Sequence, residues 1–132
     1  MAVMPQFSSP AEDYLEGRIS LDAELIRHPA ATYFIRYTAM SWREGIKHNA
    51  LLVIDTSLTP CDGSLVMCHV DGRLRVLRLR LLPRPHLEGL DRPQNKIPIT
   101  DDDYSERLVV KGVITYIIND ARSGEFDDCP VM

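Results

Sequence analysis

Ser41 is the residue whose type and surroundings point to covalent chemistry in this 132-residue chain. A serine hydroxyl becomes a nucleophile when a neighbouring base takes its proton. Ser41 and Glu44 have the spacing of a capping box, which predicts a short helix that begins at Ser41 and ends at Gly45. A capping serine is in itself a structural feature. Because a helix N-terminus also supplies backbone donors and a positive dipole end, the same position can stabilise an oxyanion.

The elements around Ser41 are predicted to be mostly strands. Aromatic, β-branched or continuous apolar runs predict strands over 32–37, 51–54, 65–70, 74–82 and 108–118. Asp71-Gly72, between two of these runs, predicts a tight hairpin, and Gly112 is a candidate for a bulge in the last run. Strands at short spacing with hairpin turns favour a compact, mostly β antiparallel fold over alternating strand–helix units.

Helix signals before Ser41 are confined to the beginning of the chain. The capping box at 9–12 predicts a short helix that Gly17 ends, and the segment 21–27 predicts a second short helix. The segment 83–103 holds four prolines and is expected to form a loop or a set of edge segments. We therefore expect a short N-terminal arm (1–8), one core domain (9–118) and an acidic C-terminal tail (119–132).

The composition, with 45% hydrophobic and 26% charged residues, is that of a globular domain. The net charge of -4 argues against strong direct binding of nucleic acid, which needs a basic face. No apolar run approaches the roughly 20 residues of a membrane helix, and the N-terminus lacks the basic and apolar regions of a signal peptide. Cys61, Cys68 and Cys129 have no patterned spacing, which indicates reduced thiols and a cytoplasmic protein.

Two clusters of charged residues are candidate binding sites, one for a metal ion and one for phosphates or an acidic partner. Asp101-Asp102-Asp103 lacks the spaced ligands of a calcium loop, so we expect a solvated turn, no metal and no cofactor. The basic cluster favours a solvated strand face over contacts with phosphates or an acidic partner. It consists of Arg73, Arg75, Arg78, Arg80 and Arg84.

Six segments of the chain, taken in their order and spacing, resemble the core of the LexA/UmuD family of serine-lysine self-cleaving peptidases. They are 9–14, 18–19, 28–34, 51–55, 70–72 and 111–114. The resemblance covers about Phe7 to Ile118. It implies a mostly β, β-clip-like peptidase core with short N-terminal helices, in which a serine nucleophile and a lysine base cut the protein's own N-terminal arm.

Carried over to this chain, the resemblance assigns the nucleophile to Ser41 and the lysine position to Leu77. Leucine cannot take a proton, so the resemblance implies a peptidase homologue whose activity is doubtful. The neighbours of Ser41 also differ from the family pattern, which has Gly-Asp before the serine and Met after it. Here those positions hold Ala39, Met40 and Trp42.

Other residues of the chain are candidates for a displaced base. Arg75 and Arg78 flank Leu77, but arginine stays protonated and cannot accept the serine proton. Lys47, Lys111 and His69 do not match the family's lysine position, and we expect none of them to serve. The pattern around Leu77 is itself irregular, because the apolar face of the predicted strand changes between Val76 and Leu77. Either a bulge or twist explains this, or Leu77 packs where an active-site cleft would otherwise lie.

The family's cut bond, commonly Cys-Gly or Ala-Gly, lies in an arm upstream of the core. Only six residues precede Phe7, and none is glycine, so the chain resembles the processed, UmuD′-like form. The implied function is an SOS-response accessory subunit that forms a homodimer, partners a UmuC-type Y-family translesion DNA polymerase and contacts RecA filaments. Two alternatives remain: a catalytically dead regulator that pairs with a LexA, UmuD or phage-repressor homologue, and an active serine self-peptidase with a displaced base.

Overall fold

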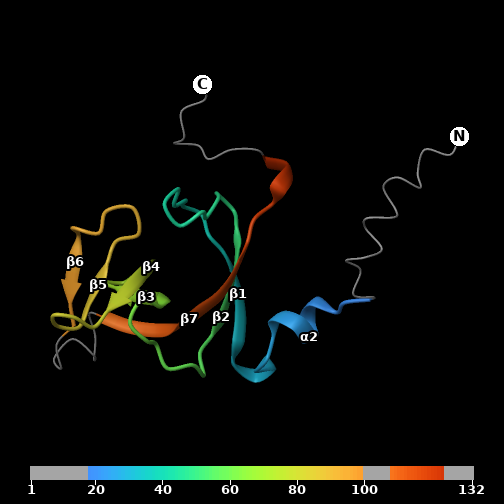
Figure 1. Ribbon diagram of the computed structural model, residues 1–132, viewed down its shortest axis with the longest axis horizontal. Helices are drawn as coiled ribbons and strands as arrows, with labels where there is room; N and C mark the ends of the chain where they lie inside the picture. Colours follow the sequence, from blue (N-terminus) through green and yellow to red (C-terminus); the bar gives the residue numbers. More distant parts are fainter. Residues whose placement is uncertain (1–17, 100–107, 124–132) are drawn as a thin grey trace, which may run out of the picture.

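The computed structural model describes residues 18–99 and 108–123. Within them, seven strands form one antiparallel sheet in the order β1-β2-β7-β3-β4-β5-β6 (Figure 1). The strands are β1 (Thr32–Arg36), β2 (Leu51–Asp55), β3 (Leu65–Val70), β4 (Arg73–Arg80), β5 (His86–Glu88), β6 (Lys96–Pro98) and β7 (Leu108–Ile118). The mostly β fold class is confirmed, and two of the strands, β5 and β6, lie in the predicted loop or edge region 83–103.

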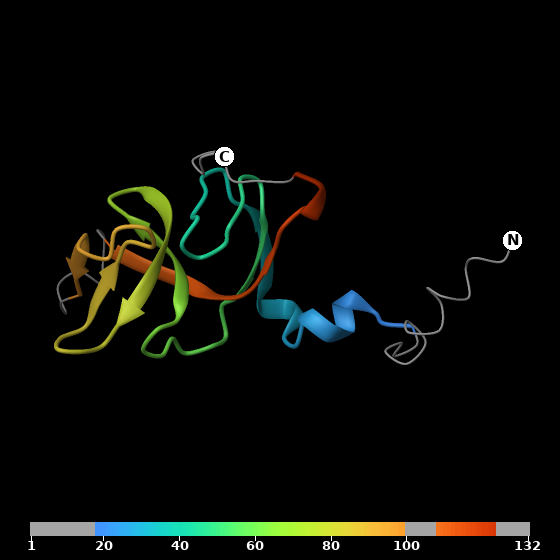
Figure 2. The same cartoon turned by 45° about the horizontal axis from the view of Figure 1, so that its top comes forward.

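The helix α2 (Leu21–Leu25) confirms the second predicted helix, two residues shorter than expected. Ser20 caps it by accepting a hydrogen bond from the Ala23 N–H at 3.4 Å. A 3-10 turn (Pro29–Ala31) follows and leads into β1. Figure 2 shows α2 projecting from the end of β1, away from β5 and β6. The first predicted helix, over 9–16, lies outside the described residues.

A buried carboxylate holds the start of this fold to the sheet. His28 Nδ1 lies 2.6 Å from Asp55 Oδ2 at the end of β2. The Ser57 hydroxyl donates to the other Asp55 oxygen, also at 2.6 Å. Hydrogen bonds from Ser57 and then from His28 lower the pKa of Asp55 to about 2. Because α2 buries none of its own side chains, this contact is a main attachment of the helical segment to the sheet.

The β3–β4 hairpin has the predicted turn. Asp71 has φ +50° and Gly72 φ +82°, the left-handed pair that a two-residue hairpin turn needs. Pairing then runs without interruption from Val70↔Arg73 to Leu65↔Arg78. This pairing contains no bulge, which contradicts the bulge as an explanation of the irregular apolar pattern of β4. Val76 and Leu77 are both buried because β4 is covered on both faces at this point.

Strand β7 joins the two halves of the sheet. It pairs with β2 on one side and with β3 on the other. Pairing steps from Gly112 to Val110 as β3 passes from Met67 to Cys68, which leaves Lys111 as the extra residue of a bulge. The predicted bulge is confirmed, one residue away from Gly112. A second register shift, opposite Val53 and Ile54, bends the pairing with β2.

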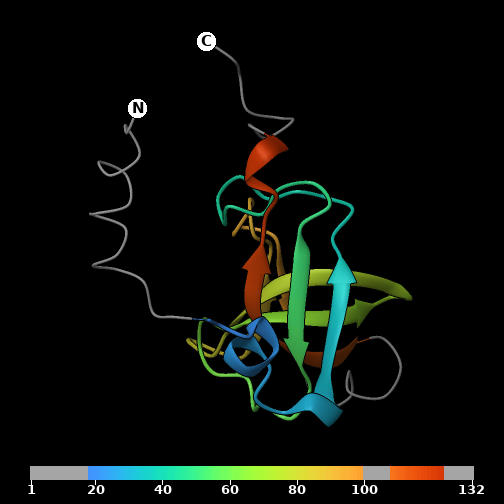
Figure 3. The same cartoon turned by 90° about the vertical axis from the view of Figure 1, so that its right-hand side faces the viewer.

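Buried side chains form two packed clusters, one on each side of β4. Figure 3 shows β1 and β2 side by side, with strands of the other half running across their direction. The first cluster contains Ile46, Ala50, Leu52, Ile54, Met67, Val76, Leu90 and Ile114. The second contains Val66, Cys68, Val70, Leu77, Leu79, Leu87 and Leu108. Adjacent residues of β4 thus pack into different clusters, as the alternating directions of strand side chains require.

Candidate serine site

Ser41 lies in a tight turn between β1 and β2, and the predicted helix over 41–45 is wrong. The backbones of Ser41 and Ile46 exchange two hydrogen bonds, each 2.8 Å long, which close the turn. The Glu44 N–H donates to Ser41 Oγ at 3.3 Å, so one half of the capping box forms. Gly45 has φ +73°, which turns the chain towards Ile46. Ile46 is fully buried, so packing of this residue fixes the turn in the core.

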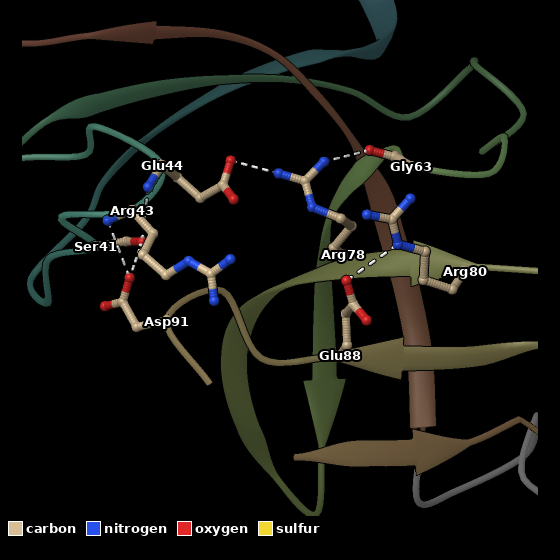
Figure 4. Close-up of polar contacts among 8 residues, drawn as sticks. All are labelled: Ser41, Arg43, Glu44, Gly63, Arg78, Arg80, Glu88 and Asp91. Carbon is tan, nitrogen blue, oxygen red and sulfur yellow. Dashed lines mark hydrogen bonds and ion pairs between the residues drawn. The ribbon is translucent and has the colours of Figure 1, made fainter. Parts of the chain in front are cut away.

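The other half of the capping box is replaced by a long-range ion pair. The Glu44 carboxylate binds the Arg78 guanidinium, whose other nitrogen donates to the Gly63 carbonyl at 2.7 Å (Figure 4). Further along β4, Arg80 pairs with Glu88 at 3.0 Å. Two arginines of the predicted basic cluster therefore make intramolecular ion pairs, a difference from the purely solvated face that the sequence favoured.

Asp91 is the residue of this site that sequence reasoning missed. Ser41 Oγ donates to Asp91 Oδ1 at 2.7 Å, and the Arg43 N–H donates to the same oxygen at 3.2 Å (Figure 4). Asp91 follows Ser41 by 50 positions and lies in the connection between β5 and β6. No local spacing in the sequence signals this contact, since it depends on packing of the whole sheet.

The connection that carries Asp91 is closed by its own hydrogen bonds. The Gly89 N–H donates to the Asn95 carbonyl at 3.0 Å, and the Asn95 N–H donates to the Arg92 carbonyl at 2.9 Å. A Cβ on Gly89 would lie 2.8 Å from the Arg92 carbonyl oxygen, so the close approach requires glycine. Leu90 is buried in the same cluster as Ile46 of the serine turn. Packing of Leu90 and the hydrogen bonds of the connection therefore both hold Asp91 within hydrogen-bond distance of Ser41.

A pocket of about 360 Å³ opens beside this contact. Ser41, Asp91 and Leu77 all line it. Ser41 is only 1% exposed and Leu77 only 2%, so both belong to the buried wall. Tyr37 lines the pocket as well, and burial, followed by the negative charge of Asp91, raises the pKa of Tyr37.

The structure places none of the residues named as alternative bases at Ser41. The side chains lining the pocket, all within the described ranges, include neither lysine nor histidine. Lys47 Nζ instead donates to the Asp120 carbonyl at 3.2 Å. His69 pairs with Leu74 across the hairpin, and Lys111 lines a different pocket. Arg75 lines the serine pocket but cannot act as a base.

Two general features bear on what the chain can bind. In the residues that the structure describes, no three side chains of the His, Cys, Asp or Glu type are placed to hold a metal ion. The predicted turn at Asp101–Asp103 lies outside those residues. No helix in the described part of the chain is long and apolar enough to cross a bilayer.

Comparison with known proteins places this chain in a family. The family model described as Peptidase S24-like matches residues 5–112. Protein ImpA of Salmonella typhimurium is 38% identical over 117 residues, which cover 88% of this chain and 78% of ImpA. Protein SamA of Salmonella typhimurium strain LT2 is 38% identical over 118 residues, covering 89% of this chain and 80% of SamA. Protein MucA of Escherichia coli is 39% identical over 111 residues, covering 83% and 75%. The chain therefore belongs to the peptidase S24-like family, the LexA/UmuD family that its sequence resembles.

Proposed function

We propose that this chain is a UmuD′-like accessory subunit of SOS mutagenesis, which forms a homodimer, partners a UmuC-type Y-family translesion polymerase and does not cut peptide bonds. Its family and its similarity to ImpA, SamA and MucA over most of their lengths support a UmuD-like role. The observation that carries the non-cleaving part is Leu77. It occupies the position that the resemblance assigns to the lysine base, and it is buried at the pocket of Ser41.

Chemistry supports the loss of cleavage. Attack by Ser41 on a peptide carbonyl requires that its proton move to a base as the new bond forms. Leucine offers no such base, and the group that does accept the Ser41 hydrogen bond is a carboxylate, which is a much weaker base than an amine. A subunit that only binds its partners has no need of this base, so the loss is compatible with the accessory role.

The partnering is tested by affinity capture of a tagged chain from DNA-damaged host cells, followed by mass spectrometry. We expect a Y-family polymerase, with or without RecA, to co-purify. A Ser41→Ala chain serves as the matched control and should capture the same proteins in the same amounts, because binding does not use the hydroxyl. Recovery of a LexA-type repressor without any polymerase would reject the accessory role and make the chain a regulator that acts by pairing.

The non-cleaving part is tested separately. The purified chain is incubated between pH 7 and pH 10, alone and with a full-length relative such as ImpA whose own serine has been replaced. Electrophoresis and intact-mass measurement then follow any cut. We expect the wild-type chain and the Ser41→Ala chain to give identical, uncut products. A cut that only the wild-type chain makes would establish an active peptidase with a displaced base.

A further inference from the structure

The hydrogen bonds at Ser41 determine which way its proton points. Ser41 Oγ donates a hydrogen bond to Asp91 Oδ1 at 2.7 Å and accepts one from the Glu44 N–H at 3.3 Å. The hydroxyl is thus bonded to a carboxylate on one side and to the backbone on the other. In a serine activated by an amine, the hydroxyl proton points instead to the unprotonated nitrogen, which takes the proton as the oxygen attacks.

Asp91 is held in this contact by more than one bond. Its Oδ1 atom also accepts the Arg43 N–H at 3.2 Å. The preceding residue, Leu90, is buried in the first cluster together with Ile46, which closes the serine turn. A hydrogen bond that involves a charged group and is supported by packing on both sides is stronger than a neutral surface contact. The hydrogen bond between Ser41 and Asp91 is therefore a fixed feature of the folded site.

We infer that Asp91 is a positioning residue that keeps Ser41 unreactive, as a second block independent of the missing lysine. The inference deepens the proposed function and rests on it, since it assumes that the serine site is silent in this chain. Leu77 and Asp91 line the same pocket, so a lysine at position 77 would bring an amine to the pocket that holds the Asp91 carboxylate. A neighbouring opposite charge favours the protonated amine, which cannot act as a base. Restoring the lysine alone would consequently leave Ser41 much less reactive near neutral pH than restoring it with Asp91 neutralised.

The test measures the reactivity of Ser41 towards a fluorophosphonate probe by mass spectrometry of the labelled peptide. In the labelling step the serine oxygen bonds to phosphorus, the P–F bond breaks, fluoride leaves, and the hydroxyl proton passes to the lysine amine. The variants compared are Leu77→Lys, Asp91→Asn and the double variant. Asparagine has nearly the same shape as aspartate and keeps an acceptor oxygen, so it removes the charge with little other change.

We expect the double variant to label at least about ten times faster than Leu77→Lys at pH 8, and its labelling midpoint to lie roughly one to three pH units lower, because the carboxylate no longer holds the amine protonated. A structural role of Asp91 alone would not move this pH midpoint. Asp62→Asn is the matched control for the loss of a loop carboxylate, since Asp62 accepts the Leu81 N–H at 2.8 Å away from the pocket. Leu79→Lys is the control for a lysine on the same face of β4.

Thermal unfolding must first show that each variant is folded, and Leu77→Lys with Asp91→Ala replaces the double variant if that one is not. The inference is overturned if Leu77→Lys labels as fast as the double variant, with the same pH midpoint. It is equally overturned if the folded double variant remains unlabelled up to pH 10. Neither result affects polymerase capture by the wild-type chain, so the failure of this inference and the failure of the accessory role are distinguishable.

Discussion

Gly112 allows β7 to pass close to the end of β2, and replacing it by alanine should destabilise the whole sheet. A Cβ at this position would lie 2.8 Å from Ile54 Cγ2, 3.1 Å from the Asp55 carbonyl oxygen and 3.2 Å from Thr56 Cα. Two of these three atoms belong to the backbone and cannot change rotamer. Overpacking of this kind typically costs 1–3 kcal/mol, so we place Gly112→Ala at about 3 kcal/mol of the free energy of unfolding.

Gly45 provides the matched control. A Cβ there would meet nothing within 4 Å, and the only penalty is the left-handed φ of +73°. That conformation costs an alanine about 1 kcal/mol. Urea unfolding followed by circular dichroism measures both variants, with the denaturant dependence expected to stay unchanged. In thermal unfolding Gly112→Ala should lower the midpoint by about 10 °C. The steric reasoning is refuted if Gly112→Ala is no more destabilising than Gly45→Ala.

Three further predictions concern titration and charge. In a Cys129→Ser background, exposed Cys61 should react with a thiol reagent at pH 8 within minutes. Cys68 should react only when the protein unfolds, because burial shields its thiol and raises its pKa to about 11. Equal reaction rates of the two cysteines would contradict the burial of Cys68. Asp55→Asn should lower the free energy of unfolding at neutral pH. The pKa of Asp55 is lowered to about 2 in the folded protein, so its ionised form stabilises the fold above pH 3.8, and this contribution is lost as the pH falls through 2. Urea unfolding of both proteins from pH 7 to pH 2 measures this contribution. A difference in the free energy of unfolding between wild type and Asp55→Asn that does not become smaller at low pH would contradict the role of the Asp55 charge. Arg78→Lys should lower the free energy of unfolding by about 1 kcal/mol, measured in urea, because lysine keeps the charge but cannot bind the Glu44 carboxylate and the Gly63 carbonyl with one planar group. An unchanged unfolding midpoint would mean that these two contacts of Arg78 do not stabilise the fold.

The parts of the fold that the sequence predicts are those governed by neighbouring residues. The β3–β4 hairpin follows from Asp71-Gly72 between apolar runs, and the observed positive φ angles are the ones that this dipeptide favours. The long β7 strand follows from its continuous apolar run. In both cases the local preference and the final structure agree, so no information from distant residues is needed.

The parts that the sequence misses depend on distant residues. The capping box at Ser41 is a local signal for a helix, yet Arg78 binds the Glu44 carboxylate and Ile46 is buried, and these two contacts favour a closed turn. Asp91 comes to Ser41 only because β5 and β6 fold back beside β4. The role of Ser41 as a nucleophile position therefore stays a prediction from the family resemblance.

The burial of Leu77 is predicted only in part from neighbouring residues and depends in part on distant ones. The position of Leu77 as the counterpart of the family's lysine came from the resemblance, and the irregular apolar face around it was visible in the sequence. Periodicity alone left two explanations open, because a strand that is half-exposed at one end and covered on both faces at the other follows no single pattern. The unbroken pairing of β3 with β4 excludes the bulge and leaves burial on both faces.

The place of β7 in the sheet also sets the order in which the chain can fold. β7 is the last strand among the described residues, but it lies between β2 and β3 in the sheet. The β3–β4 hairpin closes a two-residue turn and can form early, whereas the pairing of β2 with β7 must bring together residues about 60 positions apart, at a greater cost in chain entropy. We therefore expect that, during synthesis, β2 and the hairpin do not join in one sheet until β7, which ends at Ile118, has left the ribosome. Folding of this domain is expected to be a late, single event in which the last strand joins both halves at once.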